Sequence, residues 1–352
     1  MENELYTVRI EKIIRETPDT ITAWFENPDP QNYRYLSGQY MKVQVEIEGE
    51  TVTRAYSYSS SPVTDDMLSI TVKSVDKGLV STKLNSQLKA GETLLIGKAQ
   101  GEFFLSPDKN NSRHYVFLCA GSGITPLYSM MKTILAAEPK SRISLFYGSR
   151  REDNVIFREP LTQMEHNHKV RLTVCHSLSQ PSDSWTGEKS RVNPAFIRRV
   201  IGNLMKENDG LEKSFWLCGP GDMVVDAENT VLDLGVPQEQ IHKELFTKTK
   251  AKSRNMPGGE KMKEVKVIYD NKEHLFMVPQ GQSILDASIK EMIDLPYSCQ
   301  TGVCGSCRAK LVSGDLHVEG DDALSDEEID NGYVLVCQSH PKSDGVVLDY
   351  EE

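Results

Sequence analysis

The sequence predicts a multidomain protein in which an antiparallel β-barrel, an α/β domain with a parallel sheet and a small α+β domain follow one another. Three observations support this. Residues 1–112 contain short runs of alternating apolar and polar side chains, residues 113–246 alternate strand-like and helix-like runs, and residues 264–352 hold four of the seven cysteines. With 352 residues and 38% hydrophobic content, the chain has room for ordinary cores in two or three domains.

In the first block, apolar and polar side chains alternate with a period of two. Residues 6–10, 41–47 and 68–73 alternate apolar and polar side chains, as strands do when one face is buried and the other meets solvent. Because turn residues separate these short runs, we expect a small antiparallel barrel.

In the second block the alternation of apolar and polar residues stops. Residues 114–119 form an apolar run, which is followed by a glycine-rich turn and a helix-like stretch over 126–137. Further strand-like runs lie at 143–147, 170–174 and 215–218, with helix-like stretches between them. This alternation predicts a parallel sheet covered by helices on both faces.

The net charge of −11 is unevenly distributed. Residues 264–352 carry 6 Lys and Arg against 18 Asp and Glu, a balance of −12, whereas the rest of the chain balances at +1. Residues 247–263 hold 6 basic residues and 1 acidic residue around Pro257-Gly258-Gly259, which indicates a flexible linker. This basic run lacks interleaved aromatic residues and adjoins an acidic domain, so nucleic-acid binding is not expected.

The third block begins with a predicted hairpin over 265–269 and 274–278, followed by a helix starting near Ser283. The start of the chain has no basic segment followed by an apolar one, and no apolar run approaches the ~18 residues of a membrane span. We therefore expect a cytoplasmic protein without membrane insertion, in which clustered cysteines are more often metal or cluster ligands than disulfides.

Three cysteines, Cys299, Cys304 and Cys307, have the spacing C-x4-C-x2-C, and Cys337 follows after 29 residues. This is the plant-type spacing for a [2Fe-2S] cluster held by four thiolates. The alternative is a zinc site, which would normally show two C-x2-C pairs. On that alternative the chain would be a zinc-stabilised interaction protein without enzymatic activity.

A flavin site is indicated by Arg54, Tyr56 and Ser57, which offer a cation for a phosphate, a flat ring for the isoalloxazine and a hydroxyl for its polar atoms. An ordinary strand would also fit this short motif. A second segment supports the flavin interpretation, because a helix N-terminus with Gly and hydroxyls offers donors to a pyrophosphate. That segment contains Lys73, Gly78, Ser81 and Thr82.

A nicotinamide site is indicated at the end of the first parallel strand. The glycines of this turn would let the backbone approach a phosphate, and Pro126 suits a first helical position. A later strand closes at the same carboxyl edge of the sheet, where open α/β sheets bind ligands. The residues concerned are Gly121, Gly123, Thr125 and Pro126 in the first turn and Cys218, Gly219 and Pro220 in the second.

Nucleotide choice depends on Ser149, Arg150 and Arg151, which end the second parallel strand. A 2′-phosphate favours a guanidinium fork and a hydroxyl, whereas a bare ribose favours a carboxylate. These residues favour NADPH over NADH. Glu152 and Asp153 follow directly, so an ordinary solvated loop stays open as an alternative.

The segment 296–308, together with Cys337, resembles the plant-type ferredoxin module, and the first two blocks resemble the ferredoxin-NADP reductase superfamily. In this order the three parts resemble reductase components of bacterial oxygenases, in particular reductase subunits of the phenylacetyl-CoA epoxidase type. The resemblance implies a flavin-binding β-barrel over 1–112, a nicotinamide-binding α/β domain over 113–246 and a β-grasp ferredoxin domain over 264–352. It implies FAD in preference to the FMN of phthalate-type reductases, and it puts four side chains at the reacting rings: Tyr56, Ser57, Cys218 and Phe246.

The resemblance also implies electron transfer from NAD(P)H through the flavin and the cluster to a separate oxygenase, hydroxylase or desaturase. An alternative within this class is direct reduction of a small molecule, as in relatives that act on deoxysugar nucleotides. Residues 319–330 contain 7 acidic residues and no basic one. Such a run is often only a solvated surface, but the charge asymmetry of the chain predicts a partner with a basic docking patch.

Overall fold

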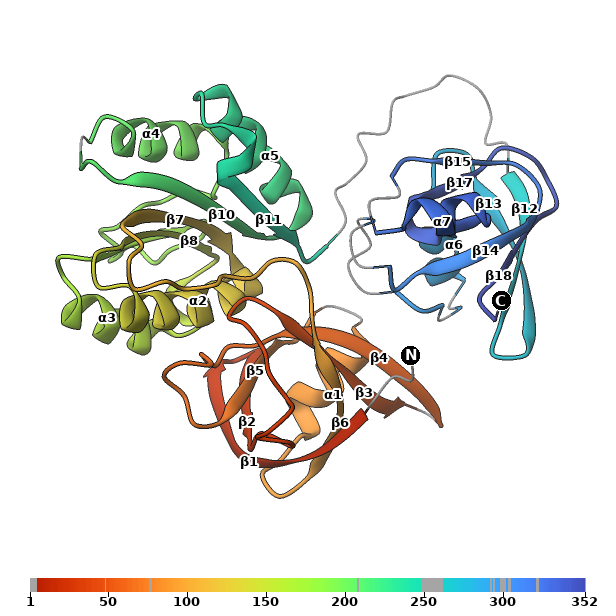
Figure 1. The fold of residues 1–352 in the computed structure, drawn as a ribbon, viewed down its shortest axis with the longest axis horizontal. Coiled ribbons are helices and arrows are strands. Elements are labelled where there is room, and N and C mark those ends of the chain that lie inside the picture. Colours follow the sequence, from red (N-terminus) through yellow and green to blue (C-terminus); the bar gives the residue numbers. More distant parts are fainter. Residues whose placement is uncertain are drawn as a thin grey trace. The chain divides into compact units, whose positions relative to one another are not determined.

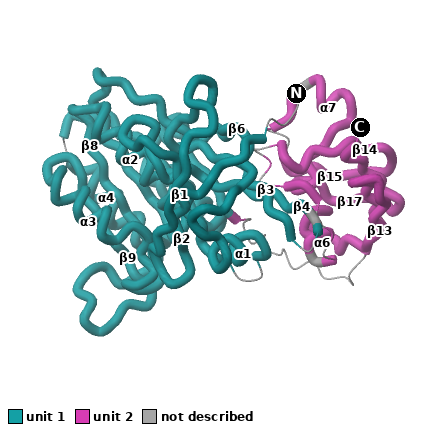
Figure 2. Tube along the Cα trace, turned by 90° about the horizontal axis from the view of Figure 1, so that it is seen from below, with its two compact units in different colours: residues 1–246 teal, residues 247–352 magenta. Residues whose placement is uncertain are grey.

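The computed structural model describes residues 5–47, 49–75, 78–207, 209–247, 262–291, 293, 295–297, 302, 305–320 and 323–351. The chain divides into two compact units, Met1–Phe246 and Thr247–Glu352, which Figure 2 colours separately. Most of the expected linker, at 248–261, lies outside the described residues. No helix in the described ranges is long and apolar enough to cross a membrane.

The first half of the N-terminal unit contains a six-stranded sheet in which every neighbouring pair is antiparallel. Its strand order is β4-β3-β6-β1-β2-β5 (Figure 1). Alternation on β3 buries Met41, Val43 and Val45, which confirms the antiparallel sheet that the period-two runs predict. The elements are β1 (Leu5–Thr17), β2 (Thr20–Phe25), β3 (Tyr40–Ile47), β4 (Glu50–Ser57), β5 (Leu68–Lys73), α1 (Leu79–Gln87) and β6 (Thr93–Gln100).

The second half of this unit contains a parallel sheet with the order β11-β10-β7-β8-β9. On β7, Tyr115 and Phe117 pack in one core with α2 and α3, whereas Val116 and Leu118 pack in another with α4 and α5. Helices therefore cover both faces (Figure 1), as predicted. The elements are β7 (Arg113–Ala120), α2 (Ile124–Ala137), β8 (Arg142–Ser149), α3 (Arg158–Asn167), β9 (Leu172–Leu178), α4 (Pro194–Leu204), β10 (Glu212–Gly219), α5 (Gly221–Asp233) and β11 (Ile241–Leu245).

One detail of this half differs from the sequence expectation. The chain leaves β7 through a 3₁₀ turn at Gly121–Gly123 and enters α2 at Ile124. Pro126 is therefore the third helical residue and not the first. The N–H groups in the first turn of a helix have no acceptor within the helix. Proline, which lacks an N–H, is therefore tolerated at the third position as well as at the first.

The C-terminal unit contains a mixed five-stranded sheet with the order β13-β12-β18-β14-β16 and a small β15-β17 ladder. The predicted helix begins at Ser283, whose hydroxyl accepts the Asp286 N–H at 3.1 Å as an N-cap. The elements are β12 (Met262–Tyr269), β13 (Lys272–Pro279), α6 (Ile284–Lys290), β14 (Arg308–Ser313), β15 (Leu316–Val318), α7 (Asp326–Asp330), β16 (Tyr333–Leu335), β17 (Ser339–Pro341) and β18 (Val346–Asp349).

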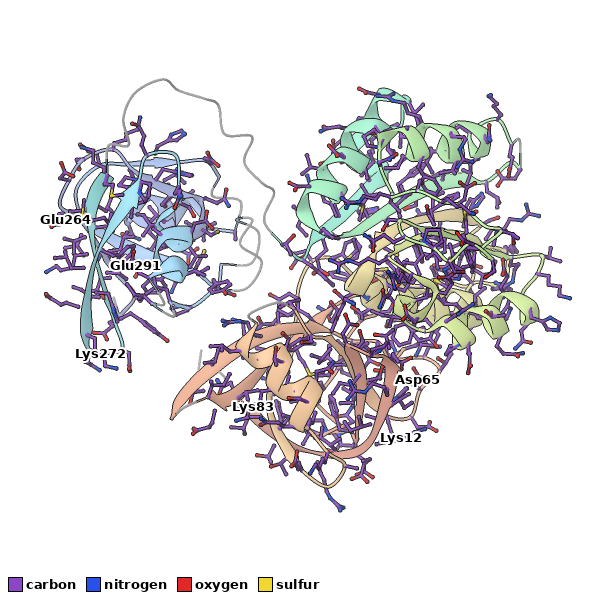
Figure 3. All side chains as sticks on the ribbon, turned by 180° about the vertical axis from the view of Figure 1, so that it is seen from behind. Lys12, Asp65, Lys83, Glu264, Lys272 and Glu291 are labelled. Atoms are coloured by element: carbon purple, nitrogen blue, oxygen red, sulfur yellow. The ribbon has the colours of Figure 1, made fainter. Side chains whose placement is uncertain are left out.

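The predicted hairpin is present but longer than expected. Met262 and Lys263, which the charge pattern assigns to the linker, are the first residues of β12. Asp270 and Asn271, both at φ 55°, form a two-residue turn, the left-handed geometry that favours a tight hairpin. Figure 3 shows Glu264 and Lys272 at opposite ends of this hairpin.

Candidate functional site

Strand β4 carries the three residues of the predicted flavin motif. Arg54 and Tyr56 share one face of the strand, and Ser57, only 6% exposed, lies on the other. Burial raises the pKa of the Tyr56 hydroxyl, and the charge of Arg54 opposes that rise. The structure thus brings a cation and a largely buried aromatic ring together, as a flavin phosphate and ring require.

The second flavin segment is the start of α1. A Cβ at Gly78 would lie 2.3 Å from Val75 Cγ2 and 2.6 Å from Ser81 Oγ, so any other residue would force these side chains to move. No side chain caps the helix at Gly78, which leaves first-turn N–H groups available to an anion. Ser81 and Thr82 lie in that first turn, and the segment fits a pyrophosphate.

Lys73 has a partner that the sequence did not predict. Its Nζ lies 2.7 and 2.9 Å from the two carboxylate oxygens of Asp19. Burial alone would raise the pKa of Asp19, but hydrogen bonds from Lys73 and Thr17 outweigh it and lower that pKa. The ammonium of Lys73 is therefore balanced by a carboxylate of this chain.

The predicted nicotinamide turn lies directly against the end of β10. Gly121 has φ +57°, a conformation that favours glycine. A Cβ at Gly123 would lie 2.2 Å from the carbonyl oxygen of Cys218 and 2.7 Å from Gly219 Cα, so the contact requires glycine. Two segments about a hundred residues apart in sequence thus form one edge, as expected for a ligand site in an open α/β sheet.

Phe246 joins the same edge, because its N–H donates to the Gly219 oxygen at 2.9 Å. Cys218 is fully buried. Burial, together with the charge of Glu244 on the neighbouring strand β11, raises the pKa of the Cys218 thiol well above its usual value. The thiol is therefore uncharged at neutral pH. Glu244 is a carboxylate at this edge that sequence reasoning missed, since it stands in an ordinary-looking strand.

Hydrogen bonds connect the two halves of the N-terminal unit beside these turns. The Ser129 hydroxyl of α2 donates to the Ser60 carbonyl, and the hydroxyls of Ser61 and Thr133 lie 2.8 Å apart. Ser60 and Ser61 follow the flavin motif closely, and α2 follows the nicotinamide turn. The connection therefore fixes helix α2 to the segment after β4.

Tyr147 was also missed by sequence reasoning. This fully buried side chain near the end of β8 donates its hydroxyl to the Gly121 carbonyl at 3.0 Å and accepts the Ile156 N–H at 3.3 Å. The glycine turn is thereby tied to the loop after β8. An aromatic residue in an apolar strand gives no sequence signal that its hydroxyl faces a distant turn.

We expect Tyr147→Phe to raise the KM for NAD(P)H roughly 2- to 10-fold and to leave kcat unchanged, because one neutral hydrogen bond contributes about 0.5–1.5 kcal/mol. Steady-state ferricyanide reduction measures both constants. The control is Tyr115→Phe, which removes a hydroxyl bonded to Glu138 at 3.0 Å near the other end of the sheet. Equal changes of KM in both variants would contradict a positioning role for Tyr147.

Ser149 is the last residue of β8, and Arg150 and Arg151 follow it directly. The Oγ of Ser149 is buried, and the Tyr147 hydroxyl is a described group that interacts with it. Arg150 and Arg151 are exposed and form no ion pair with any described residue. Glu152 is instead bound by Ser182, whose hydroxyl lies 2.5 Å from its Oε1. The observed loop leaves the guanidinium groups of Arg150 and Arg151 exposed beside the buried Ser149 hydroxyl.

His176 lies beside this loop at the carboxyl end of β9. Its ring centroid is 5.8 Å from that of Tyr147, and its Nδ1 is buried without a hydrogen-bond partner among the described residues. Burial, assisted by the charge of Arg158, lowers its pKa to about 4. The imidazole is therefore neutral and can offer one donor or acceptor to a ligand.

The structure describes Cys307 and Cys337 of the predicted cluster site, whereas Cys299 and Cys304 lie outside the described residues. Both described cysteines are buried, and the Val336 N–H donates to the Cys307 carbonyl at 3.0 Å. The side-chain amide of Gln338 donates to the Cys337 sulfur at 3.6 Å. Two buried cysteines in one core, one of them with a donor to its sulfur, fit an iron-sulfur ligand set.

Two further features of this unit fit the cluster. Gly302 and Gly305 have φ of +87° and +65°, which allows the sharp turns of a ligand loop. The Ser306 Oγ and the Tyr350 hydroxyl are buried without hydrogen-bond partners in the described part of the chain. Buried orphan hydroxyls are uncommon in folded proteins, so these two point to a group bound beside them.

The acidic run lies against the same loop. A Cβ at Gly305 would be 3.7 Å from the Ala323 carbonyl, and Arg308 forms an ion pair with Glu328 of α7. At the start of the run, the Glu319 N–H donates to the Gln338 carbonyl at 2.9 Å. Part of the acidic run therefore lies next to Gly305 and Gln338, which neighbour the described cysteines in sequence.

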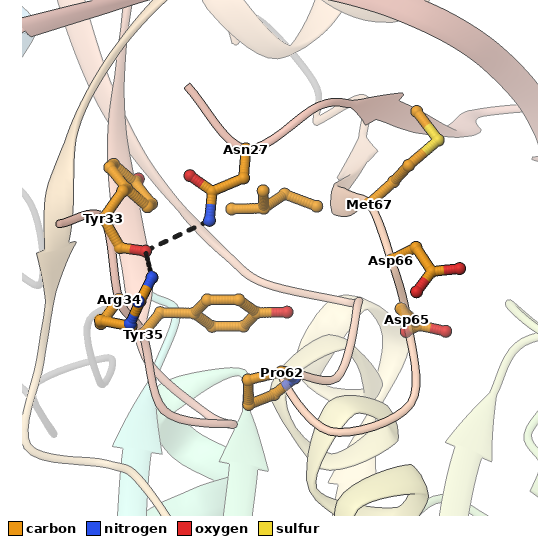
Figure 4. Close-up of a pocket in the computed structure, with 9 residues that line it drawn as sticks. Asn27, Tyr33, Arg34, Tyr35, Pro62, Asp65, Asp66 and Met67 are labelled. Atoms are coloured by element: carbon orange, nitrogen blue, oxygen red, sulfur yellow. Dashed lines mark hydrogen bonds between the residues drawn. The ribbon is translucent and has the colours of Figure 1, made fainter. Parts of the chain in front are cut away.

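A pocket of about 240 Å³ lies elsewhere in the flavin half (Figure 4). Asn27 Nδ2 and Arg34 Nη1 both donate to the Tyr33 carbonyl, at 3.2 and 3.3 Å. The described side chains that line the pocket come from the loops before β3 and β5 and from the first residue of β5, and they include none of the predicted flavin residues. We assign no function to this pocket.

Three family models match the chain in order. They are an oxidoreductase FAD-binding domain over residues 7–104, an oxidoreductase NAD-binding domain over 117–229 and a 2Fe-2S iron-sulfur cluster binding domain over 267–342. These matches support FAD, a pyridine nucleotide and a [2Fe-2S] cluster as the cofactors.

Relatives match along the whole chain. The sequence is 31% identical to a subunit of the 1,2-phenylacetyl-CoA epoxidase of Escherichia coli, over 98% of each chain. It is 30% identical to the ferredoxin reductase component of the Mycobacterium tuberculosis 3-ketosteroid-9-alpha-monooxygenase, over 98% of this chain and 96% of the relative. The solved structure of phthalate dioxygenase reductase matches in fold, with a TM-score of 0.61, 22% identity and 98% coverage of each chain.

Proposed function

Since the chain belongs to the family of oxygenase reductase components that join an FAD-binding, an NAD-binding and a [2Fe-2S] domain, we propose that it carries electrons from NADPH through FAD and the cluster to a separate oxygenase, hydroxylase or desaturase. It is an NAD(P)H-dependent oxidoreductase of the ferredoxin reductase type. We assign residues 1–112 to the flavin domain, 113–246 to the nicotinamide domain and 264–352 to the ferredoxin domain.

The flavin, when bound, supplies the change from two-electron hydride transfer to one-electron transfer. This chain's residues bind and orient it. Arg54 and the N-terminus of α1 at Gly78 would hold the phosphates, Tyr56 would pack against the ring, and the buried Ser57 hydroxyl would bond a polar atom of the flavin. Thr82 adds a hydroxyl at the start of α1.

On the nicotinamide side, the turn at Gly121 and Gly123 holds the nucleotide phosphates at the N-terminus of α2. Thr125 fixes that turn, because its hydroxyl donates to the Ser122 carbonyl at 2.9 Å. Cys218 would contribute a buried, uncharged thiol on the nicotinamide side, where it would exclude water without adding charge. Phe246, held at the same edge by its hydrogen bond to Gly219, would contribute an aromatic ring to the flavin site.

The observation that carries this proposal is the close backbone approach of Gly123 to Cys218 and Gly219. Phe246 joins the same edge through its hydrogen bond to Gly219. Absorption of the purified protein tests the proposal. Flavin and iron-sulfur bands that bleach with NADPH without oxygen support it, whereas a colourless protein containing zinc would refute it. Bleaching by NADPH with reoxidation by a sugar nucleotide alone would instead show a small-molecule reductase.

We also propose that the six-stranded sheet closes into a barrel. Tyr58, directly after β4, forms an isolated antiparallel bridge with Ile70 of β5, and β4 and β5 are the outer strands of the sheet. A bridge between the outer strands brings the two ends of the sheet together, as closure requires. Closure would hold β4 and its flavin motif next to the strand that carries Lys73.

For the exit of electrons, we propose a partner that presents a basic patch to the acidic run of residues 319–330. Its support is the position of this run, which contacts Gly305 and Gln338 and pairs with Arg308 beside a ligand cysteine. A partner that takes an electron from the cluster must approach this loop. The excess of acidic charge would then steer a basic partner to the exit point.

We expect the reduction of cytochrome c, a basic one-electron acceptor, to slow about tenfold or more as salt shortens the Debye length from about 30 to about 8 Å. The rate of flavin reduction by NADPH should change little, because it does not depend on this encounter. Stopped-flow absorbance follows both steps in the same protein.

Variants in which a glutamate is replaced by its uncharged amide show which acidic residues cause the salt dependence of cytochrome c reduction. Glu319→Gln combined with Glu327→Gln should weaken the salt dependence, whereas Glu239→Gln, an exposed acid of the N-terminal unit, should preserve it. If the three proteins respond to salt identically, the acidic run is a solubilising surface and not a docking site.

A further inference from the structure

The hydroxyl of Tyr350 is buried and has no hydrogen-bond partner in the described part of the chain. Its ring packs edge-on against Tyr269, with ring centroids 5.5 Å apart. A phenylalanine would pack in the same way without the cost of burying a hydroxyl, which is about 1–3 kcal/mol when no hydrogen bond forms. The hydroxyl therefore requires a partner that is not a described residue.

The strand register shows what lies near this hydroxyl. Lys310 of β14 is paired with Asp349 of β18, so the next antiparallel position sets Tyr350 opposite Ala309. Val346 and Leu348 are fully buried, and the period of two places Tyr350 on the same face of the sheet. Cys307, in the turn directly before β14, belongs to the same buried core as Ala309 and Leu348.

A second observation agrees with this placement. Tyr350 packs against this core, which also contains Cys337. Both described cluster cysteines therefore belong to the packing environment of this side chain. The hydroxyl of a tyrosine is a hydrogen-bond donor, so it can donate to an acceptor bound beside these cysteines.

We propose that Tyr350 donates a hydrogen bond to a sulfur of the [2Fe-2S] cluster and thereby raises the reduction potential of that cluster. The proposal rests on the proposed function, because it requires the cluster. A donor to sulfur stabilises the reduced state, which carries more negative charge, more than the oxidised state. Tyr350 is thus a positioned donor that makes electron transfer from the flavin more favourable.

The test is a redox titration of the Tyr350→Phe holoprotein followed by the EPR signal of the reduced cluster. We expect a more negative midpoint potential than in the wild type and slower cluster reduction after flavin reduction. Iron content and visible circular dichroism check that the cluster is assembled. The control is Tyr333→Phe in the same unit, whose ring faces Arg308 at 4.7 Å, and which should leave the potential unchanged.

Equal potentials in the wild type and the Phe variant would overturn the proposal. If the Phe variant does not retain the cluster, the nearly isosteric pair Tyr350→Gln and Tyr350→Met makes the same comparison, since only Gln supplies a donor. Equal potentials in that pair would also overturn it. A wild-type protein without any [2Fe-2S] signal would refute the proposed function itself, which separates the two failures.

Discussion

Cys337→Ser is expected to abolish reduction of acceptors that take electrons from the cluster, while NADPH-dependent reduction of ferricyanide continues. Cys337 is 3% exposed and receives a hydrogen bond from Gln338, so the structure has it buried and oriented by a donor to its sulfur. Four thiolates hold a plant-type cluster, and a serine oxygen is a poor substitute for one of them. The flavin and nicotinamide residues belong to the other compact unit and should be unaffected.

Three measurements check this expectation: iron content, the EPR signal of the reduced protein, and the rates with cytochrome c and ferricyanide. The matched control is Cys175→Ser, because Cys175 is a free cysteine in β9, outside the cluster unit. It should keep the cluster and both rates. A Cys337→Ser protein that loses both activities while it still binds flavin would show that ferricyanide takes electrons from the cluster.

The sequence predicted elements whose pattern is local. The period of two in 41–47 and the apolar run of 114–119 correspond to β3 and β7, because alternation and burial follow from the immediate neighbours of each residue. The boundaries were less predictable. Lys263 looks like part of a basic linker, yet it begins a strand and pairs with Asp344, 81 residues away. Such a partner is invisible in a local pattern.

The same distinction holds for the candidate site, where some residues have a local sequence signal and others gain their role from a distant part of the chain. Gly123 stands in a recognisable glycine turn, but its requirement for glycine comes from the Cys218 carbonyl on another strand. Lys73 was predicted from the sequence, whereas its partner Asp19 was not. Tyr147 and Tyr350 carried no signal, because a hydroxyl on an aromatic ring acquires a role only when the fold brings an acceptor to it.

Arg150→Ala is expected to weaken the use of NADPH by about 1–3 kcal/mol, or roughly 5- to 150-fold in kcat/KM, and to leave NADH nearly unchanged. Arg150 is exposed and makes no ion pair in the described ranges, so its guanidinium is available to a 2′-phosphate. The acid that could have neutralised it, Glu152, is bound by Ser182. The buried Oγ of Ser149 can bond the same phosphate.

The same strand supplies the control. Arg142 is the first residue of β8 and is exposed, whereas Arg150 follows directly after its last residue. Arg142→Ala removes the same charge at the amino edge of the sheet, away from the ligand edge of an α/β fold, and should not change nucleotide preference. Rates with both nucleotides, measured at several salt concentrations, separate a direct contact from the general loss of positive charge. Equal losses with NADPH and NADH in Arg150→Ala would exclude a contact with the 2′-phosphate and favour the solvated-loop interpretation of 149–153.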